Sequence, residues 1–209
     1  MELVTPPVEE AANADANARP APSQPPTPRG WIAIIEPNFS GHRWRYAEWI
    51  ADACIEAGER CVVVTDQGYA SHPFAQRIAS RADPERLRIA AIDMHTLVPA
   101  PVRNHSVYAR FHGLFTRAFA EISGEFPVRL VVVPYADYFF YTLGTFGSPF
   151  GSTDWIGLVM GASFHHSQMG VRTPPRFFVD ATKRVLFTRS MRVQGLRKLL
   201  TIDPTLPDW

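Results

Sequence analysis

Between Trp31 and Gly58 the sequence reads as an apolar strand, a turn that contains glycine, and an amphipathic helix. The apolar run that ends before Pro37 is typical of a strand that a parallel sheet buries on both faces. Ser40 is placed to cap the helix that follows, and Gly58 to end it in the left-handed conformation. Such a turn directs backbone N–H groups and the positive end of a helix dipole toward the edge of a sheet, which suits an anion such as phosphate.

Strand and helix patterns alternate along the rest of the chain. We expect further strands at Cys61–Thr65, Leu87–Ile92, Arg129–Pro134, Trp155–Met160, Arg184–Thr188 and Lys198–Ile202, and helices at His72–Ala79, Val107–Ile122, Tyr138–Phe146, Arg176–Lys183 and, as a short piece, Met191–Gly195. This alternation predicts an α/β fold: a Rossmann-like, three-layer αβα domain over residues 30–202, with a mainly parallel sheet of about six to seven strands.

The two ends of the chain differ from this pattern. Residues 1–29 contain seven of the 19 prolines, mixed with Ala, Glu and Asn. They cannot bury enough apolar area to offset the entropy of ordering, so we predict a disordered tail, either an inert leader or a polyproline ligand for a partner. Residues 203–209, which begin with Asp203-Pro204, are expected to start an interdomain linker.

Composition excludes several functional classes. A net charge of +1 gives the chain no overall attraction for nucleic acid. No apolar run reaches the roughly 20 residues that span a bilayer, and no signal peptide is evident, so we expect a cytoplasmic protein, with a peripheral position at the inner membrane face as the alternative. Cys54 and Cys61 lack metal-type spacing and are expected to be buried free thiols.

Ligands of open parallel sheets bind outside the carboxyl ends of the strands. The candidate residues are therefore those that follow strands: Asn38 to His42, Asp66, Asp137, and His165 with His166. Gly41 either lets the backbone approach an anion closely or only permits a tight turn. Asp137 either caps the next helix, faces substrate, or does both.

His165 and His166 follow the fifth predicted strand, where an imidazole can bind a sugar hydroxyl or act as a general acid or base. Adjacent side chains of an extended segment point to opposite sides, so only one of the pair is expected to face a ligand. No third ligand stands at metal spacing, so no metal site is expected.

Other motifs are missing, or leave alternatives open. The dinucleotide fingerprint, a Walker loop, a Ser-His-Asp set and a spaced pair of catalytic carboxylates are not recognisable. Residues 176–198 hold seven basic side chains against the single acid Asp180. This segment is either a solvated helix face or a surface for anionic lipid or a phosphorylated ligand.

The order of these features resembles a known family. The segments IAIIEPNFSGHRWRYAEWIADACIEAGERCVVVT, LVVVPYAD, GLVMGASFHH, RVLFTRS and KLLTIDP together resemble the N-terminal domain of a GT-B glycosyltransferase of the family 4 type. The resemblance covers roughly residues 30–209. It implies two facing domains and transfer of a sugar from a nucleotide-sugar, the co-substrate, to an acceptor saccharide or other hydroxyl acceptor. No further cofactor and no metal are implied.

The resemblance also implies roles for individual residues. Ser40, Gly41 and His42 match the loop that approaches the donor phosphates and the acceptor. His165 matches a strand-end histidine that contacts the transferred sugar, with His166 as the second choice, and Asp137 occupies a position able to reach the acceptor. His165 and Asp137 are therefore the catalytic candidates.

The sequence departs from the family in lacking the donor-binding half. We therefore expect a truncated or split glycosyltransferase half that needs a C-terminal donor-binding domain, in cis or in trans, and is weakly active or inactive alone. An exposed interdomain face of about 600–1,500 Å² would be typical, with Phe146, Phe150, Trp155 and Trp209 as expected contributors. The alternative is a non-catalytic Rossmann-like module that binds a small anion or a protein.

Overall fold

The computed structural model describes residues 30–81, 83–93, 106–162, 164, 170 and 177–207. The strands are β1 (Trp31–Ile35), β2 (Arg60–Asp66), β3 (Leu87–Ile92), β4 (Val128–Val133), β5 (Asp154–Val159) and β6 (Leu196–Thr201). The helices are α1 (Arg43–Glu56), the short 3₁₀ helix η1 (Gln67–Tyr69), α2 (Pro73–Arg81), α4 (Ser106–Ser123), α5 (Asp137–Phe146) and α6 (Phe177–Ser190). The tail predicted for residues 1–29 lies outside the described residues.

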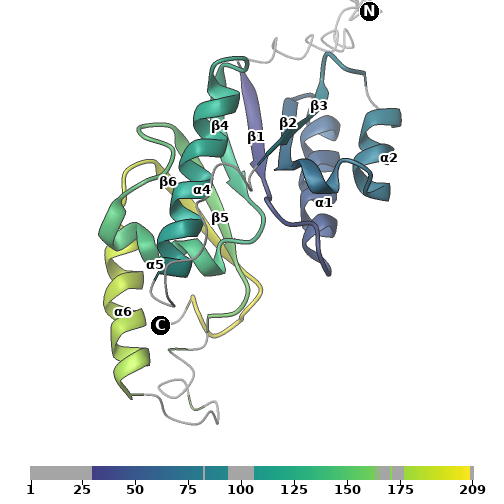
Figure 1. Ribbon diagram of the computed structural model, residues 1–209. Helices are drawn as coiled ribbons and strands as arrows, with labels where there is room; N and C mark the ends of the chain where they lie inside the picture. The colour runs from purple at the N-terminus through teal and green to yellow at the C-terminus, as the bar shows by residue number, and fades with distance from the viewer. Residues whose placement is uncertain are drawn as a thin grey trace, which may run out of the picture.

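The six strands form one parallel sheet in the order β3-β2-β1-β4-β5-β6 (Figure 1). Strand β1 is at the centre, with Ile34 paired to Val63 of β2 on one side and to Val132 of β4 on the other. The chain crosses the sheet between β3 and β4, so the strand order reverses next to β1. This is the Rossmann-like topology that the alternation of strands and helices predicted.

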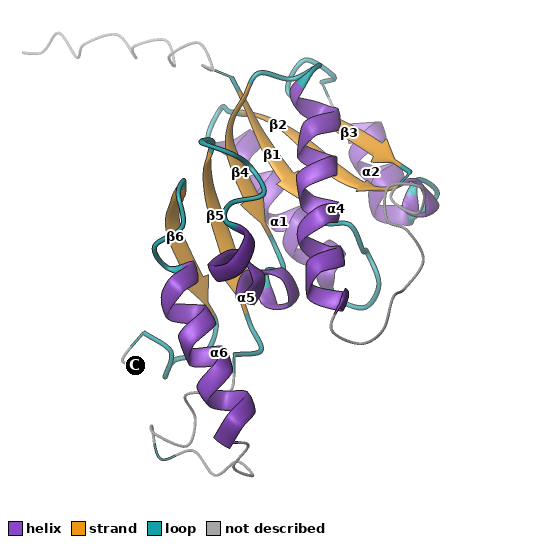
Figure 2. Ribbon diagram, turned by 60° about the vertical axis from the view of Figure 1, so that its left-hand side comes forward, coloured by secondary structure: helices purple, strands orange, loops and turns teal. Residues whose placement is uncertain are grey.

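Two helical layers cover the sheet. Helices α1 and α2 lie on one face, and α4, α5 and α6 lie on the other (Figure 2). The amphipathic helix predicted after the first strand is confirmed in α1, because Ala47, Ala51 and Cys54 are buried against the first face. On the second face Phe115 of α4 and Trp155 of β5 belong to a larger aromatic core. Each face of the sheet thus has its own apolar core, as a three-layer fold requires.

Two further expectations can be compared with the structure. Cys54 and Cys61 are buried and free, as predicted. Among the described residues no helix combines the length and the apolarity that a membrane crossing would need.

One predicted strand is wrong. Residues 184–188 lie inside α6, which continues to Ser190. Phe187 is buried, and its ring centroid lies 5.1 Å from that of Phe140 and 5.0 Å from that of Phe164. The alternation of Val185 and Phe187 is typical of a strand, but packing against α5 overrides that local preference. Residues 191–195, predicted as helical, form a turn that ends at Gly195 with φ of +80°.

Helices α5 and α6 approach each other closely at Gly144. A Cβ atom on this residue would lie 2.8 Å from Cβ of Arg189 and 2.9 Å from the carbonyl oxygen of Leu186. The hydroxyl of Ser190 accepts a hydrogen bond from the Gly144 N–H at 3.0 Å and donates to the Phe140 carbonyl at 2.8 Å. The absence of a side chain at residue 144 therefore sets the distance between the two helices.

We predict that Gly144→Ala lowers the free energy of unfolding by about 1–3 kcal/mol, because the added methyl group overpacks the contact between α5 and α6. Gly113→Ala is the matched control, since Gly113 lies in α4 and a Cβ there would meet nothing within 4 Å. The control should raise stability by up to about 1 kcal/mol through helix propensity alone. Urea denaturation measures both variants, and a stabilising effect of Gly144→Ala would contradict the packing argument.

Candidate functional site

The loop after β1 is fixed by a network of side chains. The Asn38 amide oxygen accepts hydrogen bonds from the Ser40 N–H at 2.7 Å and from the Tyr69 hydroxyl at 2.8 Å. Phe39 is only 1% exposed, and its ring packs against the rings of Tyr69 and Phe74. The loop is therefore anchored to η1 and α2 before it reaches the start of α1.

The start of α1 differs from the prediction. Ser40 does not cap the helix: α1 begins at Arg43, and His42 occupies the N-cap position without a side-chain cap bond. Ser40 lies within the turn that Asn38 closes, which places it too early for the cap. Gly41 has φ of +62°, and a Cβ there would meet nothing within 4 Å. Gly41 thus permits the left-handed turn, and the space beside its Cα is unfilled.

The amino end of α1 is electrostatically positive. Its first turn contains no acidic residue and begins with Arg43, although cations are normally unfavourable at this end of a helix. The Arg43 guanidinium lies 4.3 Å from the ring centroid of Tyr135, and the ring of His42 lies 6.4 Å from that of Tyr135. Tyr135 follows β4, which pairs with β1. Contacts of His42 and Arg43 with Tyr135 therefore join the segment after β1 to the segment after β4.

Sequence reasoning missed Arg43 and Tyr135. A basic residue in the first turn of a helix that also lacks an acid is a detectable signal, because it opposes the helix dipole. Nothing in the sequence indicated Tyr135, since its contact with Arg43 depends on the pairing of β1 with β4.

Glu36 is a buried carboxyl group beneath the loop after β1, and it was not predicted from the sequence as a site residue. It is 1% exposed, and its Oε1 accepts a hydrogen bond from the Asn38 N–H at 3.1 Å. The same Oε1 lies 4.0 Å from Nη1 of Arg43, and Oε2 has no hydrogen-bond partner among the described residues. Burial raises the pKa of Glu36 to about 8, against the smaller opposing effects of the Asn38 N–H and Arg43. The group is therefore mostly protonated at neutral pH.

Asp137 connects the ends of β4 and β5. It is the first residue of α5, whose N-cap is Ala136, so of the alternatives left open for Asp137 the helix cap is wrong. Its carboxylate accepts hydrogen bonds from the Met160 N–H, at 3.0 Å to Oδ2, and from the Gly161 N–H. A Cβ on Gly161 would lie 3.1 Å from Asp137 Oδ1, so glycine permits this approach. Asp137 thereby holds the segment that leads toward His165.

The other candidates have simpler outcomes. His165 and His166 lie outside the described residues, so their roles stay predictions. Asp66 accepts a hydrogen bond from the Gly68 N–H at 2.8 Å and caps η1. Within the described ranges no group of three or more His, Cys, Asp or Glu side chains is arranged to hold a metal ion.

The basic residues of 176–198 have varied surroundings. Arg176 is outside the described residues. Arg184 donates to the Phe164 carbonyl at 3.1 Å, and Arg197 pairs with Asp154 at 2.8 Å. Lys183 lies over the ring of Tyr141 at 5.4 Å. Lys183, Arg184 and Arg197 thus already contact other parts of the domain.

We predict that Glu36 makes the folded state less stable as pH rises. Its pKa is about 8 in the folded state, whereas the ordinary value for a glutamate is 4.5, so the folded chain retains a proton that the unfolded chain loses between these values. The free energy of unfolding should therefore fall by about 1.4 kcal/mol per pH unit in that window. Glu36→Gln, which imitates the protonated group, should remove this decline.

Urea denaturation between about pH 5 and 8 measures the effect. Glu125→Gln is the control, because Glu125 is an exposed carboxylate in a surface pair with Arg88 at 3.6 Å. If wild type, Glu36→Gln and the control show the same pH dependence, Glu36 is not titrating as described.

Known structures share this fold, although no family model and no curated protein sequence matches the chain. UGT89C1 of Arabidopsis thaliana, in complex with quercetin, superposes with a TM-score of 0.52 and 14% identity over 84% of this chain. UGT2 of Phytolacca americana has a TM-score of 0.47 and 11% identity over 86% of this chain, and the match covers 47% of its own length. The glycosyltransferase SnogD of Streptomyces nogalater has a TM-score of 0.33 and 12% identity over 83% of this chain, and the match covers 44% of its own length.

This chain spans 44% of the length of UGT89C1, under half of that protein. At 14% identity, the superposition with UGT89C1 shows a shared fold. The domain therefore has the fold of the part of UGT89C1 that it matches.

Proposed function

We propose that this chain is the N-terminal, acceptor-side half of a glycosyltransferase that moves a sugar from a nucleotide-sugar to a hydroxyl acceptor. One observation carries the proposal. The amino end of α1, with His42 and Arg43 and no acidic residue, lies at the edge where β1 and β4 end. Backbone N–H groups, a helix dipole and a guanidinium at one place favour a diphosphate.

In this proposal the residues divide into two groups. Ser40, Gly41 and His42 contact the donor phosphates and the acceptor, with His166 as a further substrate contact. His165 and Asp137 are the catalytic candidates. The bonds from Met160 and Gly161 to the Asp137 carboxylate support a positioning role as well, because they hold the start of the segment that contains both histidines.

A second domain completes the enzyme in this proposal. It binds the nucleotide and stabilises the departing diphosphate, for which the N-terminal half supplies only part of the charge. Apolar side chains on the face of β5 and β6 that lies on the α1 side are consistent with a partner domain there. Ile156 and Leu158 of β5 are half-buried on this face. Leu200 of β6, which pairs with Leu158, is 45% exposed, and Ile202, just after β6, is 61% exposed.

The aromatic contributors predicted from the sequence give a mixed outcome. Phe146 is 55% exposed, but Phe150 and Trp155 belong to the core, and Trp209 is outside the described residues. The apolar surface available to a partner therefore comes mainly from other residues.

We infer the substrate class by analogy with the similar proteins. UGT89C1 has been crystallised with quercetin and, separately, with UDP-L-rhamnose. We infer a nucleoside-diphosphate sugar as donor for this chain, and membership of family 4 as the finer assignment. A contact of residues 176–198 with anionic lipid at a membrane surface belongs to the same proposal.

We predict that Arg43→Met weakens binding of a nucleoside diphosphate about tenfold or more, because it removes a charge-assisted contact. Arg129→Met is the matched control: Arg129 pairs with Glu59 at 2.7 Å at the amino end of β4, the opposite edge of the sheet. Calorimetric titration with UDP, GDP and ADP measures the effect. Equal losses in both variants would indicate non-specific charge attraction.

Transfer is tested with the chain joined to any polypeptide encoded in frame after it, using a panel of nucleotide-sugars and mass spectrometry of the products. Transfer that His42→Ala reduces about tenfold or more would support the proposal. Diphosphate binding without transfer from any donor would favour the alternative, a non-catalytic anion-binding module.

A further inference from the structure

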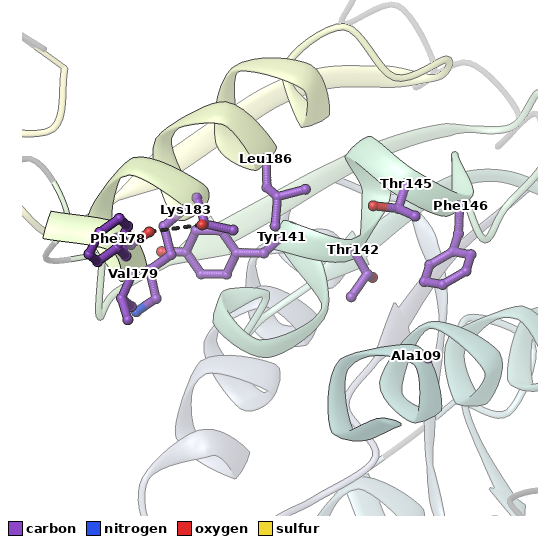
Figure 3. A pocket seen from close by; sticks show the side chains of 10 residues that line it. Ala109, Tyr141, Thr142, Thr145, Phe146, Phe178, Val179, Lys183 and Leu186 are labelled. Atoms are coloured by element: carbon purple, nitrogen blue, oxygen red, sulfur yellow. Dashed lines mark hydrogen bonds between the residues drawn. The ribbon is translucent and has the colours of Figure 1, made fainter. Parts of the chain in front are cut away.

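A groove of about 570 Å³ lies between α4, α5 and α6, on the face of the sheet opposite α1 (Figure 3). Its walls include Ala109 from α4, Tyr141 and Phe146 from α5, and Phe178, Val179 and Lys183 from α6. The volume falls within the range of sites that bind small ligands. None of these residues belongs to the site at the end of β1.

The groove walls are mainly apolar, and several apolar side chains at α6 are exposed. Phe178 is 90% exposed, Val179 is 47% exposed, and the adjacent Phe177 is 79% exposed. Across the groove, Phe146 of α5 is 55% exposed. An exposed apolar patch of this kind on a domain surface marks a binding surface, because water contact with these side chains costs free energy that a ligand recovers.

Among the described residues that line the groove, Lys183 is the one that carries a charge. Its ammonium nitrogen lies 5.4 Å from the ring centroid of Tyr141, and none of the ion pairs among the described residues includes it. The side chain is half-buried, so its charge is partly desolvated, and no carboxylate of the described residues offsets the cost. A bound anion would supply that charge.

We propose that this groove binds an amphiphile with a single alkyl chain and an anionic head group. The chain lies along the apolar walls of α5 and α6, and the head group pairs with Lys183. Charge complementarity selects the head group, and the apolar lining selects the tail. The proposal does not depend on glycosyltransferase activity.

The groove is also close in sequence to the candidate site. Tyr141 lies one helical turn after Asp137 on α5, so the end of the groove that holds Lys183 is the end nearer to Asp137. If the proposed sugar transfer holds, the anionic head group of a bound amphiphile lies toward the reacting edge of the sheet.

The test measures binding of alkyl phosphates to the full chain by calorimetry, at concentrations below micelle formation. Affinity should rise about fourfold per added methylene group until the groove is filled, and then level off. Lys183→Met should weaken binding of decyl phosphate at least tenfold and leave binding of decanol nearly unchanged. Ala109→Trp, which narrows the groove from an exposed position on α4, should weaken both.

Lys198→Met is the matched control, because Lys198 is an exposed lysine of β6 outside the groove. Thermal unfolding of each variant checks that it folds. The proposal is overturned if Lys183→Met binds decyl phosphate as wild type does, or if decyltrimethylammonium binds equally well. It is also overturned if the chain binds phosphatidylglycerol vesicles but no monomeric alkyl phosphate, since that result indicates adsorption to a membrane surface.

Discussion

The pairing of β1 with β2 on one side and β4 on the other determines where this domain can meet a ligand. Because all six strands are parallel, their carboxyl ends lie at one edge of the sheet. The strand order reverses beside β1, so the loops that follow β1 and β4 lead away from each other. The loop after β1 therefore faces the residues after β4 rather than being covered by a neighbouring connection. The contact of Arg43 with Tyr135 is the direct result of this topology.

Two carboxyl groups, Glu36 and Asp137, have different roles at the carboxyl edge of the sheet. Glu36 is buried below the loop, and its raised pKa keeps it largely neutral, so it does not cancel the positive end of α1. Asp137 is bonded to the N–H groups of Met160 and Gly161, and so connects the end of β5 to the start of α5. The positive charge at the start of α1 is thus preserved, while the adjacent strand ends are held together. Such an arrangement favours an anionic ligand over a neutral one.

Much of the fold could be predicted from local patterns, and the site could be predicted only in outline. Apolar runs bounded by turns located β1 to β5, because strands of a parallel sheet are buried on both faces. The pattern failed at residues 184–188, where β-branched and aromatic residues pack as a helix against α5. The loop around Gly41 and His42 was found because it follows a strand. Glu36, Arg43 and Tyr135 were not, since their importance arises from burial and from contacts across the sheet.

The central claim is that an anionic donor binds where β1 and β4 end. The most direct measurement is an NMR titration of the isotope-labelled chain with UDP-glucose, following the backbone amide resonances. The account predicts that the perturbed amides cluster at residues 40–43, 135–137 and 160–161. Perturbations confined to the groove between α5 and α6, or to the amino ends of the strands, would contradict it.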